Sequence, residues 1–180
     1  MSEAVDSNEF YSPTFGFKVT KPGQWRFICA DEYMRHVQTV TSNDEMFLRY
    51  ANVPLMSAAK YEEPHPDLNP SIKVQVKPNR SGPINAKEMA GILLDLMRRF
   101  ADDFAAEGPD DCTVGGAAAV RTVATYTMGT VDGQSFPVYS ELWVVPRASQ
   151  YFLIAVSRRQ DAPQSDVEDL RHLVESICFE

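Results

Sequence analysis

Histidine and carboxylate side chains are the first residues to consider for chemistry, and they gather most closely in one loop. His65 stands in Tyr61-Glu62-Glu63-Pro64-His65-Pro66-Asp67, within a proline-rich acidic segment that we predict over residues 54–70. Imidazole nitrogen and carboxylate oxygen are both metal ligands, but the spacing matches no recognised ligand pattern. The sequence therefore favours a solvated surface loop here, with a metal site as the alternative.

A second group of residues could supply a nucleophile or a base. Gly133-Gln134-Ser135-Phe136-Pro137 places a serine after a glycine, but it lacks the second glycine and the strand–turn–helix setting of a hydrolase elbow. His172 has Glu168 four residues before it and Glu175 three residues after it. On a surface helix that spacing is typical of ordinary side-chain pairing, so we predict no catalytic residue.

Five carboxylates are concentrated over a short stretch, at Asp102-Asp103, Glu107 and Asp110-Asp111. We interpret them as a solvated acidic rim near the end of a helix, with a paired acid–base site as the alternative. The chain has neither G-x-G-x-x-G nor G-x-x-x-x-G-K-[ST], and Gly115-Gly116 precedes a strand, so we predict a turn there and no cofactor.

Aromatic side chains form the last group, and they can either fill a core or bind a partner. The sequence favours the core for Trp25, Tyr126, Tyr139, Trp143 and Tyr151. If Trp143 is exposed, it is our candidate anchor for a partner protein.

Composition limits the function classes. The 180 residues carry 17 basic and 25 acidic side chains, a net charge of −8. This excess of negative charge argues against binding to a nucleic-acid backbone or to an anionic membrane. The three cysteines (Cys29, Cys112 and Cys178) are far apart, which argues against a disulfide framework and a zinc site.

The N-terminal residues are acidic and polar, unlike a secretion signal. No stretch of about 18 apolar residues occurs that could span a membrane. We therefore expect a cytoplasmic protein.

Three strands joined by short turns are predicted over Ala117–Ser157. The segments are rich in β-branched and aromatic residues, and Gly and Pro punctuate them. Connections this short favour antiparallel neighbours. Ser71–Lys77 also alternates between apolar and polar residues, and we predict a half-exposed strand near a sheet edge.

Two amphipathic helices are predicted to cover this sheet. The first begins at Asn85, carries an apolar stripe from Met89 to Phe104, and ends at Gly108-Pro109. The second begins with Ser165 as its cap and carries Val167, Leu170, Val174 and Ile177 on one side. The chain is therefore predicted to be α+β, with a central antiparallel sheet between helices.

The N-terminal part is less regular. Residues 1–13 are predicted to be a flexible lead-in, followed by one domain over residues 14–180. Met46–Ala51 is a candidate strand, residues 31–44 fit a helix or a strand, and one helical turn is possible near Met56–Tyr61.

Three stretches resemble the PsbP-like superfamily, which includes the photosystem II extrinsic subunit, the Ran guanine-nucleotide release factor and many bacterial proteins. Residues 14–25 (TFGFKVTKPGQW) look like its opening G-F-x-x-x-x-P-x-x-W, residues 151–157 look like a central strand, and Ser176-Ile177-Cys178-Phe179 looks like its closing S-I-x-F. The resemblance implies an α/β/α sandwich of bacterial type and no shared catalytic residues. A related group of chaperones with this fold cradles apolar helices.

The function predicted from these observations is a cytoplasmic, non-catalytic protein-binding or chaperone and assembly module. Its predicted partner is another protein, with no nucleic acid or membrane involved, and the chain is expected to be a monomer or a homodimer. The alternatives are a small-molecule or metal-binding protein, or a hydrolase with an unrecognised pocket.

Overall fold

The computed structural model describes residues 8–39, 53–79, 85–130 and 133–180. Within them the elements follow one another in this order: β1 (Glu9–Ser12), β2 (Phe17–Thr20), β3 (Arg26–Phe27), α1 (Ala30–Thr39), β4 (Met56–Ala59), β5 (Ser71–Pro78), α3 (Ala86–Arg98), β6 (Asp102–Val114), β7 (Ala117–Gly129), β8 (Ser135–Pro146), β9 (Gln150–Arg159), α4 (Gln164–Glu175) and β10 (Cys178–Phe179).

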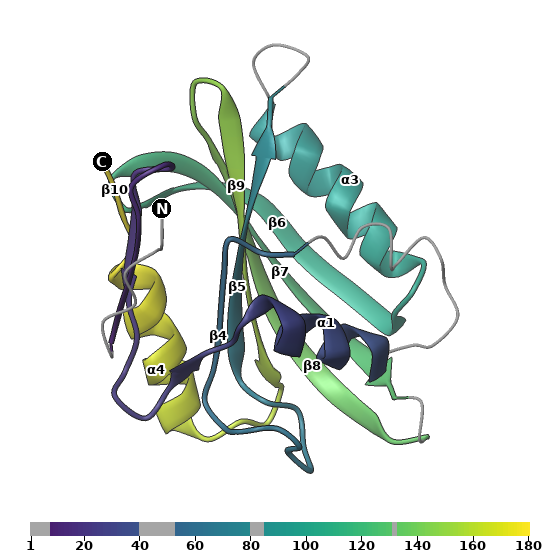
Figure 1. Ribbon diagram of the computed structural model, residues 1–180. Helices are drawn as coiled ribbons and strands as arrows, with labels where there is room; N and C mark the ends of the chain where they lie inside the picture. Colours follow the sequence, from purple (N-terminus) through teal and green to yellow (C-terminus); the bar gives the residue numbers. More distant parts are fainter. Residues whose placement is uncertain (1–7, 40–52, 80–84, 131–132) are drawn as a thin grey trace.

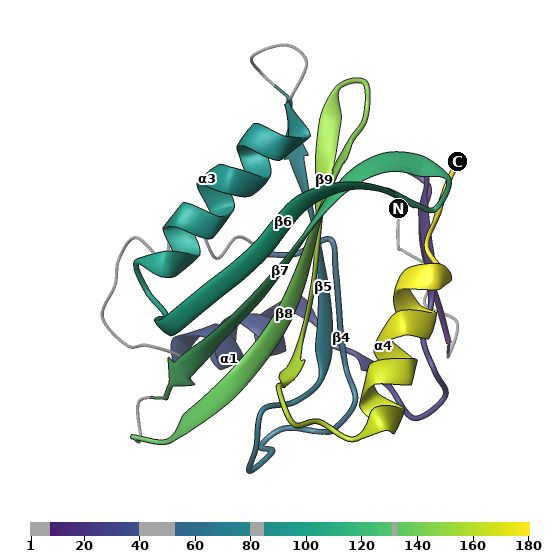
Figure 2. The same ribbon diagram turned by 180° about the vertical axis from the view of Figure 1, so that it is seen from behind.

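A large antiparallel sheet forms the centre of the molecule (Figures 1 and 2). Over the described residues it has seven strands in the order β3-β4-β5-β9-β8-β7-β6. The predicted meander is present as β7, β8 and β9, and β6 adds a fourth consecutive strand at the edge. A smaller sheet, β1-β2-β10, joins the two ends of the described chain.

The two faces of the large sheet are covered by different elements. Helix α3 packs on β6, β7 and β8, whereas α4 packs on β2, β5 and β9. Figure 1 shows α1 and α3 on one face, and α4 with the small sheet on the other. The predicted α/β/α arrangement around an antiparallel sheet is therefore confirmed.

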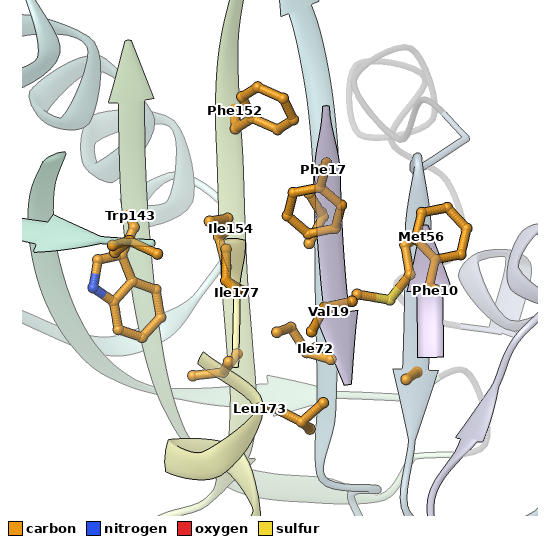
Figure 3. Packing of buried hydrophobic residues seen from close by; sticks show 14 of the residues in the cluster. Phe10, Phe17, Val19, Met56, Ile72, Trp143, Phe152, Ile154, Leu173 and Ile177 are labelled. Carbon is orange, nitrogen blue, oxygen red and sulfur yellow. The ribbon is translucent and has the colours of Figure 1, made fainter. Parts of the chain in front are cut away.

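The main hydrophobic core lies on the α4 face. Phe17, Phe152, Ile72 and Ile154 are fully buried there, and Leu173 and Ile177 cover them from the C-terminal segment (Figure 3). Ile72 and Val74 of β5, and Phe152, Ile154 and Val156 of β9, stand at alternate positions, so one face of each strand supplies this core.

The first predicted helix starts as expected but ends early. Asn85 caps α3 by accepting hydrogen bonds from the backbone N–H groups of Lys87 and Glu88. The helix then closes after Arg98, and residues 102–114 form β6 instead of continuing to Gly108. Phe104 therefore belongs to a strand, and its spacing from Phe100 matched the helical stripe by coincidence.

Gly108-Pro109 interrupts β6 rather than ending a helix. The pairing of β6 with β7 shifts register between Glu107 and Asp110. This shift leaves Gly108 and Pro109 without a partner residue on β7. Proline lacks the N–H that a ladder needs, and it is tolerated at such irregularities. At Gly108, a Cβ would lie 2.8 Å from the carbonyl oxygen of Arg121, so only glycine fits. The turn predicted at Gly115-Gly116 is confirmed between β6 and β7.

Several shorter predictions are corrected. Residues 9–12 form β1 rather than part of a lead-in, because they pair with β2. Met56–Ala59 form the buried strand β4 and not a helical turn. Strand β5 lies inside the sheet between β4 and β9, not at its edge. Helix α4 begins at Gln164, without a side-chain cap from Ser165. The candidate strand Met46–Ala51 lies outside the described residues.

Residues 31–39, which fitted a helix or a strand, lie in α1, which begins at Ala30; the rest of the ambiguous stretch lies outside the described residues. None of the helices in the described part of the chain is long and apolar enough to cross a membrane.

A buried ionic cluster holds α4 against the sheet. The Lys60 ammonium lies 2.7 Å from Asp166 and 2.9 Å from Asp169, and all three side chains are at most 16% exposed. Trp25 and Gln24 also donate hydrogen bonds to the Asp169 carboxylate. Burial opposes the charge on Asp169, but the bonds from Lys60, Trp25 and Gln24 outweigh it and lower its pKa.

This cluster predicts a loss of stability in acid. A carboxyl group with a lowered folded-state pKa stabilises the fold above its unfolded pKa of about 3.9, and this contribution disappears as the pH falls through the folded value. Asp169→Asn is therefore expected to reduce the free energy of unfolding at pH 7 and to flatten its decline in acid. Urea unfolding of both proteins from pH 7 to pH 2 measures this, and equal slopes would contradict the prediction.

Candidate binding site

A groove lies between α1 and α3 above the face of the large sheet opposite the main core. Its volume is about 410 Å³, which is in the usual range of small-ligand sites. Both helices line it, Glu32 and Tyr33 from α1, and Leu93 and Met97 from α3, while β4, β5, β7, β8 and β9 form its floor.

The groove is hollow because its floor is built from small side chains. The pairing of the strands aligns Ala59, Ser71, Ser157, Ser140 and Ala124 in one row across the sheet, from β4 to β7. The neighbouring row runs from Ser57 through Lys73 and Ala155 to Leu142. Strands normally carry β-branched and aromatic residues at such positions, and their replacement by Ala and Ser leaves space above the sheet.

One wall of the groove is apolar and the floor is partly polar. Leu93, Leu96, Met97 and Phe100 come from α3 and the turn after it. Ile92, on the same helix, is 57% exposed and points away from the groove.

The apolar stripe predicted for this helix has two roles. Its N-terminal part packs on β7, β8 and β9, and its C-terminal part lines the groove.

Tyr126 brings a hydroxyl group to the floor beside the serine row. Burial raises the pKa of Tyr126, and side-chain hydrogen bonds with Ser140 and Ser157 partly oppose this shift. Ser140 also donates to the backbone carbonyl of Val156, at 3.0 Å. The aromatic ring of Phe104 stacks against Tyr126 at 6.3 Å between centroids. Hydroxyl groups thus line one part of an otherwise apolar groove.

The charged groups of the groove differ in their partners. Glu32 is paired with Arg26. Glu63 accepts hydrogen bonds from the Asn69 amide and the backbone N–H of His65. Lys73, from the centre of β5, has its ammonium 5.8 Å from the centroid of the Tyr33 ring, with no carboxylate within 4.0 Å in the described part of the chain.

Trp143 lies outside this groove. It is 7% exposed and belongs to the core on the α4 face, next to Ile154 and Ile177 (Figure 3). The preference for core aromatics is correct for Trp143 and Trp25, which is 2% exposed. A partner anchor at Trp143 would need an exposed ring, and the Trp143 ring is buried.

The loop around His65 borders a separate hollow of about 440 Å³. The His65 ring stacks on Tyr61 at 4.5 Å, and its Nδ1 lies 2.9 Å from the backbone carbonyl oxygen of Asp67. The Asp67 carboxylate binds Arg159 at 3.0 Å. Among the described residues, no three His, Cys, Asp or Glu side chains are placed to share a metal ion.

The other sequence candidates are dispersed. His172 is exposed near the end of α4, where Glu168 binds Gln164 and Glu175 lies 3.9 Å from Arg171. The carboxylates at positions 102, 103, 107, 110 and 111 are exposed on the edge strand β6 and not at a helix end. Ser135 begins β8 and is also exposed.

The groove residues were missed by sequence reasoning. Their signal was the run of small residues at alternate positions, Ala155 and Ser157 on one strand and Ser57 and Ala59 on another. This pattern predicts a groove only when the strand register is known, because the register shows that the small residues lie side by side.

Comparison with known proteins supports the fold. No family model and no curated protein matches the sequence. Among solved structures, the cyanobacterial PsbP (CyanoP) of Synechocystis sp. PCC 6803 matches with a TM-score of 0.56, at 8% identity, over 100% of this chain and 97% of that one. The chain has a PsbP-like fold.

A second structure with this likeness is LpqN of Mycobacterium tuberculosis, described as involved in cell envelope biogenesis. It matches with a TM-score of 0.55, at 13% identity, over 90% of this chain and 82% of that one. At these identities the likeness concerns the PsbP-like fold alone. The fold predicted from the three short sequence stretches is thereby confirmed.

Proposed function

We propose that this protein is a non-catalytic binding module, and that the groove between α1 and α3 is its binding site. The observation that carries the proposal is the cavity of about 410 Å³ with an apolar wall and a row of hydroxyl groups on its floor. Sites for organic ligands have this composition, mostly apolar with a few polar groups that orient the ligand.

The two faces of the sheet support this assignment. The α4 face is filled by large side chains such as Phe17, Trp143 and Phe152, whereas the α1–α3 face carries Ala and Ser at matching positions. A sheet that needed only to be stable would gain by filling both faces, since each buried methylene contributes about 0.8 kcal/mol. Over the described residues this space is open, and a bound apolar group would fill it.

Other parts of the sequence-based function remain predictions. They are the cytoplasmic location and the protein partner. The monomeric or homodimeric state is also a prediction.

Blocking the groove tests the proposal. Wild-type protein is expected to bind the neutral dye N-phenyl-1-naphthylamine with a rise in fluorescence. Ala155→Leu places a larger side chain on the floor and should weaken binding by about tenfold or more. The control Ala118→Leu makes the same change at an exposed position of β7 and should bind like the wild type.

Circular dichroism establishes that both variants are folded. Equal dye affinity for Ala155→Leu and the wild type would exclude the groove as the site. Absence of dye binding by the wild type would remove the proposal itself.

A further inference from the structure

We propose that the groove takes a single-chain amphiphile with an anionic headgroup, which lies at Lys73 while its hydrocarbon chain extends along α3. The inference rests on the proposed function and names the ligand class of the same site. Its starting point is the charge arrangement around β5.

Among the described residues, no carboxylate lies within 4.0 Å of the Lys73 ammonium. The two acidic side chains of the groove, Glu32 and Glu63, are engaged by Arg26, by Asn69 and by the backbone of His65. Within the described residues, the Lys73 ammonium lies over the Tyr33 ring, 5.8 Å from its centroid. An anion would gain a charge-assisted hydrogen bond at this position without displacing an existing ion pair.

A second lysine strengthens the positive potential on this strand. Burial and the charge of Lys73 both lower the pKa of Lys77. Lys77 stands four residues after Lys73 on the same face of β5, so this face of the strand carries two positive side chains. The protein as a whole is acidic, with a net charge of −8, so the overall charge would not attract an anion and the lysines of β5 would have to do so locally.

The charged lysine and the apolar wall lie in different parts of the groove, Lys73 on β5 and the wall on α3, with hydroxyl groups on the floor between them. Ser57 pairs directly opposite Lys73, and Ser71 lies two residues before it on the same face of β5, so both serines neighbour Lys73 in the sheet. Leu96, Met97 and Leu142 line the part beside α3. The headgroup oxygens would accept hydrogen bonds beside Lys73, and the hydrocarbon chain would be buried against α3.

The volume favours a flexible chain over a protein helix. A helix about 10 Å across occupies roughly 400 Å³ in a single turn, so the groove of about 410 Å³ would accept little more than one turn. Recognition of an amphipathic helix uses apolar residues over several turns. A single hydrocarbon chain places much more of its surface in the same volume.

Isothermal titration calorimetry with three ligands that share one chain length tests the inference. Decanoate, decanol and decyltrimethylammonium are titrated into the wild type, Lys73→Met and Lys87→Met. Lys87 is exposed outside the groove, where it pairs with Asp111, and serves as the matched control. Decanoate should bind the wild type most tightly, and Lys73→Met should weaken it by about tenfold. Binding of decanol should be unchanged in both variants.

Competition with the dye separates the possible failures. If the dye binds the wild type but decanoate and decyltrimethylammonium displace it equally well, the anionic class is wrong and the groove remains a binding site. If an amphipathic leucine–lysine peptide displaces the dye and decanoate does not, the occupant is a protein segment. If the dye does not bind at all, the proposed function fails together with the inference.

Discussion

Replacing Lys60 with methionine is expected to lower the free energy of unfolding by about 3–5 kcal/mol, the range for breaking a buried ion pair from one side. The Lys60 ammonium is the shared partner of Asp166 and Asp169, at 2.7 and 2.9 Å. Its removal leaves two carboxylates close together, with exposed fractions of 6% and 16%. Their mutual repulsion adds to the cost of keeping each of them away from water.

The sign of the effect follows from the titration of Lys60. Burial opposes its charge, but the hydrogen bonds and charges of the two aspartates outweigh burial and raise its pKa. A raised pKa of a basic group stabilises the fold below the unfolded value of about 10.4, and this contribution is lost only as the pH rises through the folded value. The full effect of Lys60→Met is therefore present at pH 7.

Urea unfolding at pH 7 measures this prediction, and a surface pair supplies the control. Lys18 lies 2.8 Å from Glu9, with both side chains 40% exposed, so Lys18→Met should change stability by about 0.5 kcal/mol or less. The triple variant Lys60→Met, Asp166→Asn, Asp169→Asn should recover much of the loss, because no buried charge remains. A loss below about 1 kcal/mol for Lys60→Met would contradict the structural role of the cluster.

The ionic cluster also shows what sequence reasoning could not reach. Lys60 and Asp166 are separated by 106 residues, and neither stands in a pattern that marks a buried charge. They meet because β4 lies beside β5, β5 beside β9, and β9 leads into α4. Such a contact depends on strand order, and hydrophobic periodicity reports only the class of each element.

The meander and the edge strand illustrate the same limit. Strands β7, β8 and β9 were predictable because both of their faces are covered, so their sequences are dense in β-branched and aromatic residues. Strand β6 was mistaken for the end of a helix because it is largely exposed and carries five carboxylates. An exposed edge strand has no alternation between buried and exposed faces for a sequence pattern to record.

The groove was missed for a different reason. Each small residue on its floor is unremarkable by itself, since Ala and Ser occur in any strand. Only the register between β5, β9 and β8 collects Ser71, Ser157 and Ser140 into one row. Catalytic side chains and metal ligands have recognisable sequence patterns, whereas the feature that suggests function here is a groove left open by small side chains.

The two faces of the sheet therefore divide stability and binding between them. The α4 face holds the main core, including residues from both ends of the described chain, Phe10 and Phe179. The α1–α3 face has a smaller packed cluster around Ala90 and Val144, with the groove beside it. This division predicts that a cavity made on the α4 face should reduce stability without changing the groove.

Phe152→Ala tests this division and is expected to lower the free energy of unfolding by about 3–5 kcal/mol. The Phe152 side chain is fully buried in the α4-face core (Figure 3), stacked 5.7 Å from Phe17 and edge-on 4.9 Å from Phe179. Its removal takes away a large apolar surface and leaves a cavity bounded by the rigid sheet, which cannot easily collapse. Denaturant unfolding at pH 7 measures the loss.

Two controls separate the core from the groove. Ile92→Ala removes an exposed side chain from α3 and should change stability by about 0.5 kcal/mol or less. Folded Phe152→Ala protein should bind N-phenyl-1-naphthylamine as tightly as the wild type, because Phe152 and the groove lie on opposite faces of β9. Weaker dye binding by the fully folded Phe152→Ala variant would show that the two faces are coupled through the sheet. A loss of stability below about 1 kcal/mol would instead place Phe152 outside the main core.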